Sequence, residues 1–452
     1  MAAAWASDAA SDESGRETAE LLSRLIQINT TNPPGNETAV AHFLRDYFAA
    51  HGVEGEVVGE WPERQNFVAR LQGSRPGPTL VVMAHMDVVP CEPEQWSQPP
   101  FSGLIKDGYV WGRGADDIKN LVAAETVAFL RLAAAGADFA GTLVLAATAD
   151  EEVGDQCGAR WLVQNRPDLV RCDYLLNEGG GEYVEVRGKR TYMLTVGEKG
   201  TAQFKLTFHG ESGHASVPPH GSNAVADMAR AITALVEYEP QLRFDCVPEL
   251  LIECLVGDAG LRARLLDPAQ ARPALAELRA ADAETAALIE PLYGITLVPT
   301  IVRAGGEAVN VLASHAEVTV DCRTLPGQTE DDVRREVEAA LGGPSDWELE
   351  WIGTVAGNDS PVVTPFSRAI NKVMTEAVPG AVVAPMHCVG FTDCNWYRAS
   401  FPDVVAYGFG PYIAEDYLAT GPRCHNHDER ITVRDIGFQA AFVERLVREL
   451  LR

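Results

Sequence analysis

Side chains that can bind metal ions follow four apolar stretches of the chain. The four groups are His85-Met86-Asp87, Gly112-Arg113-Gly114-Ala115-Asp116-Asp117, Asp150-Glu151-Glu152 and Asn177-Glu178. A histidine-rich segment, Cys424 to Glu429, lies near the C-terminus. Because the carboxyl ends of parallel strands meet at one edge of an open α/β sheet, we expect these ligands to converge there. Together they supply more carboxylates than two metal ions need, so the pattern predicts a dinuclear hydrolytic site.

One histidine or one acidic run would not support this prediction by itself. A histidine after an apolar strand is usually structural, and three acids such as Asp150-Glu151-Glu152 most often begin a solvated helix. These acids instead follow the apolar run Leu143 to Ala149, and the other strand ends add further carboxylates. Neighbouring carboxylates in a cleft are costly unless cations neutralise them. Imidazole and carboxylate ligands fit catalytic Zn²⁺, with Mn²⁺ or Co²⁺ possible in its place.

Adjacent glutamates at the end of a strand point in different directions. One member of the pair Glu151 and Glu152 can therefore bind a metal while the other faces a metal-bound water. A metal lowers the pKa of its water towards neutrality, and a neighbouring carboxylate can take that proton and pass it to a leaving nitrogen. The residues thus predict separate ligand and general-base roles, and they leave open which glutamate has which role.

Composition excludes several classes of function. The net charge of -27 and the absence of a basic cluster argue against a nucleic-acid partner. The odd number of cysteines, nine, has no paired spacing and suits reduced thiols in a cytoplasmic protein. Residues 1–15 lack the pattern of a signal peptide, and no apolar stretch reaches the ~18 residues of a membrane span. We therefore expect a soluble cytoplasmic protein without a membrane partner.

Strand-like and helix-like segments alternate through about residue 190, which predicts an α/β domain with a mostly parallel sheet flanked by helices. After Gly197 the pattern changes to strands and helices with hairpin-like intervals, typical of a smaller inserted α+β domain. Leu261 to Ile289 is expected to add helices to that domain. The predicted division is a mobile tail (1–16), a catalytic domain in two parts (17–196 and 359–452) and an inserted lid or dimerisation domain (197–358).

The motifs together resemble a known family. They are His85-x-Asp87, Gly112-Arg113-Gly114-Ala115-x-Asp117-x-Lys119, Glu151-Glu152, Asn177-Glu178-Gly179, Gly213-His214-Ala215-Ser216, Asn310-Val311, Asp321-x-Arg323 and His425-x-x-Asp428-Glu429. Their order is similar to that in the dinuclear zinc metallopeptidases of the aminoacylase, carboxypeptidase and succinyl-diaminopimelate desuccinylase type. The resemblance extends from about residue 17 to the C-terminus. Eight such motifs in one order are very rare by chance.

The resemblance implies that Asp117 bridges two divalent metal ions. Each metal would have two further ligands: His85 and Glu178 for one, Glu152 and His425 for the other. His425 is chosen by its spacing to Asp428-Glu429, although His427 lies two residues away and could compete for the metal. Asp87 would fix the ring tautomer of His85. Glu151 would be the general base.

The resemblance also implies roles for the inserted domain. His214 would polarise the scissile carbonyl, often in the site of the partner subunit, so we expect a homodimer through this domain. A substrate carboxylate would be held by Asn310 and Arg323, since the planar fork of arginine meets a carboxylate bidentately. The remaining expected substrate contacts come from a glycine-containing loop through Gly390 and Thr392.

Two departures from the family pattern concern substrate binding. Val389 replaces the first of two glycines in the loop, and Ala313 stands where proline often follows the Asn-Val pair. The residues around Trp96 and Trp111 resemble the carboxypeptidase and N-acyl amino acid hydrolase branch more than the desuccinylase branch.

The sequence therefore predicts a hydrolase that cleaves an amide bond in small peptides or N-acyl amino acids with a free carboxylate. The expected mechanism uses a water between two metals and Glu151 as general base. A dipeptidase or carboxypeptidase is favoured, and an N-acyl amino acid amidohydrolase is the alternative. A metal-containing binding protein without catalysis is a third possibility, ranked lower because every metal ligand and Glu151 are present.

Overall fold

The computed structural model describes residues 12–452, apart from 155, 217–222, 245, 306–307 and 344–346. The chain forms two compact units. The first contains the described residues up to Val196, together with Ser360–Met386 and Thr392–Arg452. The second contains Gly197–Asp359 and His387–Phe391. Residues 1–11 of the predicted tail lie outside the described residues. The rest of that prediction is wrong, because helix α2 (Asp12–Ile26) already includes residues 12–16.

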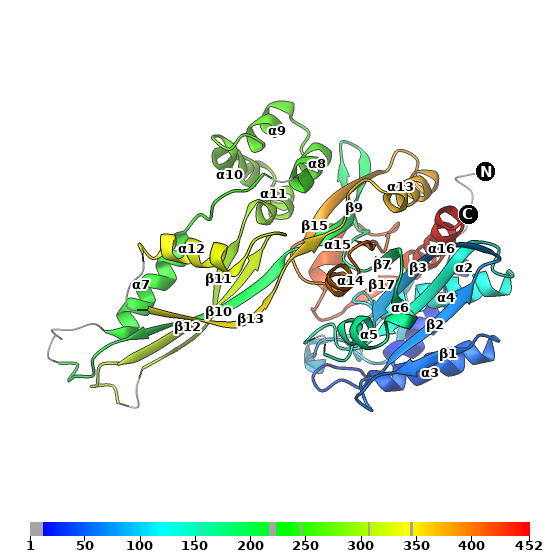
Figure 1. The fold of residues 1–452 in the computed structure, drawn as a ribbon, viewed down its shortest axis with the longest axis horizontal. Coiled ribbons are helices and arrows are strands. Elements are labelled where there is room, and N and C mark those ends of the chain that lie inside the picture. Colours follow the sequence, from blue (N-terminus) through cyan, green and yellow to red (C-terminus); the bar gives the residue numbers. More distant parts are fainter. Residues whose placement is uncertain (1–11, 155, 217–222, 245, 306–307, 344–346) are drawn as a thin grey trace. The chain divides into compact units, whose positions relative to one another are not determined.

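The first unit is built on a sheet whose central strands are parallel (Figure 1). Its strand order is β1 (Gly55–Val58), β2 (Asn66–Gln72), β6 (Ala140–Thr148), β3 (Arg75–His85), β7 (Tyr174–Asn177), β16 (Val405–Gly408) and β9 (Lys189–Glu198). Strands β6, β3, β7 and β16 pair in parallel, whereas β1, β2 and β9 pair antiparallel with their neighbours. The predicted α/β class with a largely parallel central sheet is confirmed.

Helices bury both faces of this sheet, as a parallel sheet requires. All nine residues of β6 are buried, which explains its apolar run from Leu143 to Ala147. One face packs against α5 (Ala159–Asn165), α6 (Pro167–Val170) and α14 (Cys394–Ser400), which share a core with alternate residues of β3 and β6. On the other side, α4 (Lys119–Ala134), α16 (Val433–Leu450) and α2 pack against one another, and α4 contacts β3 and β6.

Two further helices complete the packing of the first unit. The Phe48 ring at the end of α3 (Glu37–Ala50) lies 4.9 Å from the Phe67 ring of β2 and 5.4 Å from the Phe129 ring of α4. Helix α13 (Pro365–Ala377) packs on α16. Helices α2 and α3 flank the loop through Asn32.

A second, smaller sheet in the first unit corrects one detail of the strand-end prediction. Strands β4 (Leu104–Lys106), β5 (Tyr109–Trp111) and β17 (Arg430–Thr432) form an antiparallel sheet in the order β17-β5-β4. The apolar stretch before Gly112 is thus not a strand of the parallel sheet. Asp117 is delivered by the loop between this small sheet and α4.

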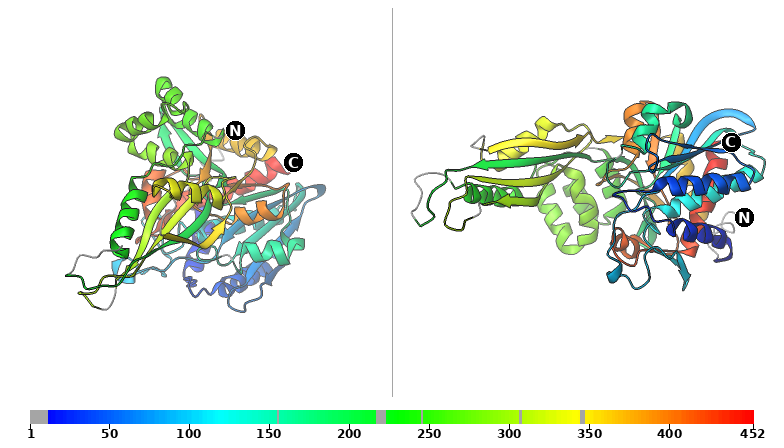
Figure 2. Two further views of the ribbon diagram at one scale, coloured as in Figure 1. Left: turned by 60° about the vertical axis from the view of Figure 1, so that its left-hand side comes forward. Right: turned by 90° about the horizontal axis from the view of Figure 1, so that it is seen from below.

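The second unit is an α+β structure with its own core (Figures 1 and 2). Its antiparallel sheet has the order β11 (Thr296–Ala304), β12 (His315–Thr324), β10 (Gly200–His209) and β13 (Trp347–Val355). Helices α7 (Ala224–Glu237) and α12 (Glu330–Ala340) contribute buried side chains to the core formed with this sheet. The predicted extra helices are α9 (Ala259–Leu265), α10 (Ala271–Ala281) and α11 (Ala283–Ile289), preceded by α8 (Cys246–Leu255).

No helix in the described part of the chain combines the length and apolarity needed to cross a membrane. In the described part of the chain, eight cysteines from Cys91 to Cys424 lie outside any disulfide. Two edge strands, β11 and β13, were not predicted. Residues 300–304 of β11 are all exposed, so that stretch shows no alternation of buried and exposed side chains. Strand β13 does alternate from Trp347 to Ile352, although none of its residues is fully buried.

Candidate metal centre

Three of the ligand groups lie at the carboxyl ends of adjacent parallel strands. His85 is the last residue of β3, and its Cα pairs with Thr148, the last residue of β6. Glu151 and Glu152 follow β6 by a few residues, and Glu178 follows β7, the other neighbour of β3. The topology therefore places these carboxylates around the imidazole of His85.

Asp117 lies between the two histidines. Its Oδ1 is 3.2 Å from Nε2 of His85, and its Oδ2 is 3.1 Å from Nε2 of His425. On the first side, His85 Nε2 is 3.8 Å from Glu178 Oε2. On the second side, His425 Nε2 is 3.2 Å from Glu152 Oε2. The carboxylate of Asp117 thus presents one oxygen to each of two groups of possible metal ligands.

The segment that carries His425 is tied to the loop that carries Asp117. The carboxylate of Glu429 is fully buried and accepts hydrogen bonds from the backbone N–H groups of Gly114 (3.1 Å), Asp116 (2.7 Å) and Asp117 (3.0 Å). Arg113 Nη1 forms a 2.6 Å ion pair with the same carboxylate. These bonds hold the loop that carries Asp117 in a fixed position relative to the segment that carries His425.

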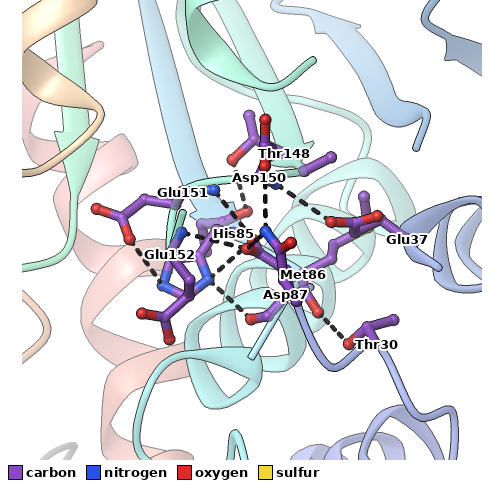
Figure 3. A network of polar contacts seen from close by, with 12 residues as sticks. Thr30, Glu37, His85, Met86, Asp87, Thr148, Asp150, Glu151 and Glu152 are labelled. Atoms are coloured by element: carbon purple, nitrogen blue, oxygen red, sulfur yellow. Dashed lines mark hydrogen bonds and ion pairs between the residues drawn. The ribbon is translucent and has the colours of Figure 1, made fainter. Parts of the chain in front are cut away.

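Asp87 connects His85 to the turn that carries the two glutamates (Figure 3). Nδ1 of His85 lies 3.0 Å from the carbonyl oxygen of Asp87 and 3.5 Å from its Oδ1. The backbone N–H groups of Glu151 and Glu152 donate to Oδ1 and Oδ2 of Asp87, both at 3.2 Å. A single buried carboxylate therefore orients the ring of one histidine and positions both glutamates.

A second buried network holds Asp150, the residue before these glutamates. Asp150 has a left-handed backbone with φ of 64°, which is unfavourable for a residue other than glycine. Its Oδ1 accepts from Arg64 Nη2 (2.8 Å) and Asn32 Nδ2 (3.1 Å). Arg64 also pairs with the fully buried Glu37 at 2.6 Å, and Asn32 Nδ2 donates to Asp87 Oδ2 at 2.8 Å. These bonds stabilise the strained turn and so the position of Glu151.

The donor atoms suit divalent cations. Ligand atoms lie within 4.8 Å of one another in three groups: His85 with Glu151 and Glu178, His85 with Asp117 and Glu152, and Asp117 with Cys424 and His425. The side chain of Glu152 is 6% exposed, and its Oε1 is buried without a hydrogen-bond partner. A buried carboxylate oxygen without a donor is costly, and a metal ion would satisfy it.

The crowding of these ionisable side chains shifts their pKa values. Hydrogen bonds to Asp117 and Glu152 raise the pKa of His425 to about 10. Burial raises the pKa of Glu178 to about 8, against the opposing attraction of His85. Burial also raises the pKa of Glu151 well above its usual range, and the neighbouring charge of Glu178 adds to the effect. The cluster therefore binds protons where divalent cations would otherwise stabilise the ionised carboxylates.

The residues expected in the inserted domain lie in the second unit. His214 forms an isolated antiparallel bridge with Val311, and the N–H of Ala215 donates to the carbonyl of Asn310 at 2.9 Å, so His214 and Asn310 are neighbours. Arg323 lies on β12, and its Nε is 3.2 Å from Oδ1 of Asp321.

The expected substrate loop divides between the two units. Gly390 belongs to the second unit, whereas Thr392 belongs to the first. Within the first unit, a Cβ on Gly179 would lie 3.3 Å from Cγ2 of Thr392, which places Thr392 next to the residue that follows Glu178.

Sequence reasoning missed several residues of this site. Glu429 was quoted only for its spacing, and Arg64, Glu37 and Asn32 were not singled out. Asp393, a buried neighbour of the cluster, was also missed. Its Oδ2 accepts a hydrogen bond from Thr148 Oγ1 at 3.2 Å, and its charge raises the pKa of both Glu151 and Glu178. The only available signal was its place beside Thr392 in the expected loop.

Comparison with known proteins bears directly on this centre. The model of peptidase family M20/M25/M40 matches residues 81–449 of the chain. The chain belongs to this family. The match begins in β3, four residues before His85, and ends in α16, so it includes every metal-ligand candidate. Family membership confirms the expectation of a metal-dependent hydrolase of amide bonds.

Members and relatives of the M20 family span nearly the whole chain. Human N-fatty-acyl-amino acid synthase/hydrolase PM20D1 is 27% identical, with 95% of this chain and 87% of the relative covered. The probable succinyl-diaminopimelate desuccinylase of Staphylococcus aureus is 29% identical, with 88% and 90% covered. The M20 family metallo-carboxypeptidase Sso-CP2 of Sulfolobus solfataricus superposes with a TM-score of 0.72 at 18% identity, covering 96% of this chain and 99% of that chain. The last likeness shows the shared fold.

The Arg64 network predicts a loss of rate without a loss of metal. In the R64Q variant of this M20 protein, Asp150 and Glu37 lose their common cation, so the turn that carries Glu151 should loosen. We expect kcat to fall by roughly 10- to 100-fold, as for a small misplacement of a catalytic group, while metal content stays unchanged. The control is R75Q, which removes only an exposed ion pair with Asp138. A kcat equal to that of the wild type would contradict the positioning role.

The raised pKa of His425 predicts that metal uptake releases protons. With a pKa of about 10, the imidazole carries a proton at pH 7 and must lose it before binding a metal. Metal affinity should therefore rise with pH up to about 10, the pH at which this proton dissociates without metal. Calorimetric titration of the metal-depleted protein at pH 7, in two buffers with different ionisation enthalpies, measures the release directly. A binding enthalpy that is equal in both buffers would refute the prediction.

Proposed function

We propose that this M20 hydrolase binds two divalent metal ions, one on each side of the carboxylate of Asp117. His85 and Glu178 would complete one site, and Glu152 and His425 the other. The main support for this proposal is the position of the Asp117 carboxylate. Its Oδ1 lies 3.2 Å from His85 Nε2, and its Oδ2 lies 3.1 Å from His425 Nε2. A carboxylate with one oxygen towards each imidazole has the arrangement that a bridging ligand needs.

Bound divalent metals polarise a substrate carbonyl and lower the pKa of a water. In the proposed reaction, Glu151 takes a proton from the attacking water and gives it to the leaving nitrogen. Glu151 is suited to both steps because burial raises the pKa of its carboxyl group, so the group can hold the proton between them. Its backbone is held by Asp87, which keeps the carboxylate in place.

The substrate would carry a free carboxylate next to the scissile amide. We propose that Arg323 and Asn310 hold this carboxylate and that His214 stabilises the oxyanion, with Gly390 and Thr392 completing the substrate contacts. An arginine fork suits a planar carboxylate, and the bond from Nε to Asp321 would orient the guanidinium. These roles rest on the family motifs in the second unit.

Small peptides are the favoured substrate class, so we propose a dipeptidase or carboxypeptidase. N-acyl amino acids are the second candidate class, favoured by the human N-fatty-acyl-amino acid synthase/hydrolase, which matches 95% of this chain. The two classes share the amide bond and the free carboxylate and differ only on the acyl side. The same metal centre would serve both.

Three further proposals concern the protein as a whole. Zn²⁺ is the proposed native metal because imidazole and carboxylate ligands form catalytic zinc sites, and Co²⁺ or Mn²⁺ could replace it.

A homodimer through the second unit is proposed from the family role of His214. A cytoplasmic location without membrane or nucleic-acid partners is supported by the cysteines that lie outside disulfides in the described part of the chain and by the net charge of -27.

Replacing Glu151 with glutamine should separate catalysis from metal binding. The E151Q variant keeps the shape of the side chain but cannot accept the proton, so kcat should fall by about 10²- to 10⁴-fold. Two metals per chain should remain. The matched variant E152Q removes a proposed ligand from the neighbouring position, and its metal content should fall towards one per chain. Turnover by E151Q at the wild-type rate would refute the proposed general base.

A panel of matched substrates should show whether the carboxylate is recognised. The KM values of dipeptides and N-acyl amino acids are compared with those of their C-terminal amides. The comparison is made for the wild type, for R323M and for R303M, a control that replaces an exposed arginine. We expect the amides to have a KM at least tenfold higher, which corresponds to roughly 1.4 kcal/mol for a lost charged hydrogen bond. R323M should remove this preference and R303M should keep it. Equal KM values for acids and amides with the wild-type enzyme would contradict carboxylate recognition.

A further inference from the structure

A thiol lies within the ligand cluster and has no role in the centre described so far. Sγ of Cys424 is 3.2 Å from Oδ2 of Asp117. This is the same oxygen that Nε2 of His425 approaches at 3.1 Å. The ligand atoms of Asp117, Cys424 and His425 all lie within 4.8 Å of one another. Cys424 also lines the cleft beside Asp117 and Glu178.

A second observation points to a cation on the same side of Asp117. The Glu152 side chain is 94% buried, its Oε2 lies 3.2 Å from His425 Nε2, and its Oε1 has no hydrogen-bond partner. A buried carboxylate with an unsatisfied oxygen is stabilised by a metal ion. The side of the centre that has the thiol is therefore also a side with a buried carboxylate oxygen that lacks a hydrogen-bond partner.

We propose that Cys424 is an additional metal ligand, so that the metal on the His425 side is bound by Asp117, Glu152, His425 and the sulfur of Cys424. The inference rests on the proposed dinuclear centre. The thiol would lose its proton to solvent as the metal–sulfur bond forms. This metal would then have four protein ligands, whereas the other would have three, His85, Asp117 and Glu178.

The two metal positions would then differ in chemistry. A thiolate is a soft ligand and favours Zn²⁺ or Co²⁺ over Mn²⁺, whereas a site of imidazole and carboxylates discriminates less. The sulfur-containing site should retain its ion during dialysis longer than the three-ligand site. Glu151 lies near the three-ligand position, with its Oε2 4.0 Å from His85 Nε2.

The test is the absorption spectrum of the protein loaded with two equivalents of Co²⁺. The wild type should show a near-ultraviolet sulfur-to-cobalt charge-transfer band, and C424S should lose it. The control C91S removes a different thiol that lines a pocket with His425, and it should keep the band. A dicobalt wild-type protein without the band, or a band that persists in C424S, would overturn the proposal.

X-ray absorption of the wild-type zinc protein gives a readout that needs no variant. We expect about one sulfur neighbour per two zinc ions at about 2.3 Å. Metal content is measured on the same sample. Two bound zinc ions without a sulfur neighbour would exclude Cys424 while leaving the proposed centre intact. A protein that binds no zinc and no cobalt would refute both the inference and the proposed function.

Discussion

The electrostatic repulsion between several carboxylates at one edge of a sheet determines the chemistry of this site. Asp117, Glu151, Glu152 and Glu178 converge around two imidazoles. Burial removes most of the water that would otherwise screen their repulsion, so the pKa values of Glu151 and Glu178 rise. Two divalent cations would neutralise the ligand carboxylates, and Glu151 would be left to exchange a proton. The same repulsion thus favours both metal binding and a general base.

Such a cluster needs a rigid framework, and the surrounding side chains supply it. Glu429 and Arg113 fix the loop of Asp117, while Asp87 fixes the ring of His85 and the backbone of Glu151. Arg64 provides a partly buried cation behind this framework. A misplacement of even 1 Å at a catalytic group can cost a large factor in rate, so these contacts matter for activity as well as for stability.

The sequence allowed prediction of the parts of the centre that follow from local pattern. His85, Glu152 and Glu178 lie at the ends of apolar runs, and the parallel sheet brings them together. Asp117 followed a strand of a different, antiparallel sheet, so the strand-end argument alone did not place it correctly. The family resemblance supplied its role.

The supporting network could not be predicted because its partners are distant in sequence and belong to no shared motif. Asn32 and Asp150 are 118 residues apart, and Arg113 and Glu429 are 316 apart. Edge strand β11 was also missed, because residues 300–304 are all exposed and lack the alternation that reveals a half-buried strand. Strand β13 was missed although its sequence alternates from Trp347 to Trp351, so its pattern did carry a usable signal.

The central claim is that Asp117 bridges two metals while Glu151 binds neither. Anomalous diffraction from crystals of the zinc-loaded protein, recorded above and below the zinc edge, tests it most directly. We predict two anomalous peaks, each within bonding distance of one oxygen of Asp117, with the carboxylate of Glu151 outside bonding distance of both. A single peak, or a peak bound by Glu151 in place of Glu152 or Glu178, would contradict the account.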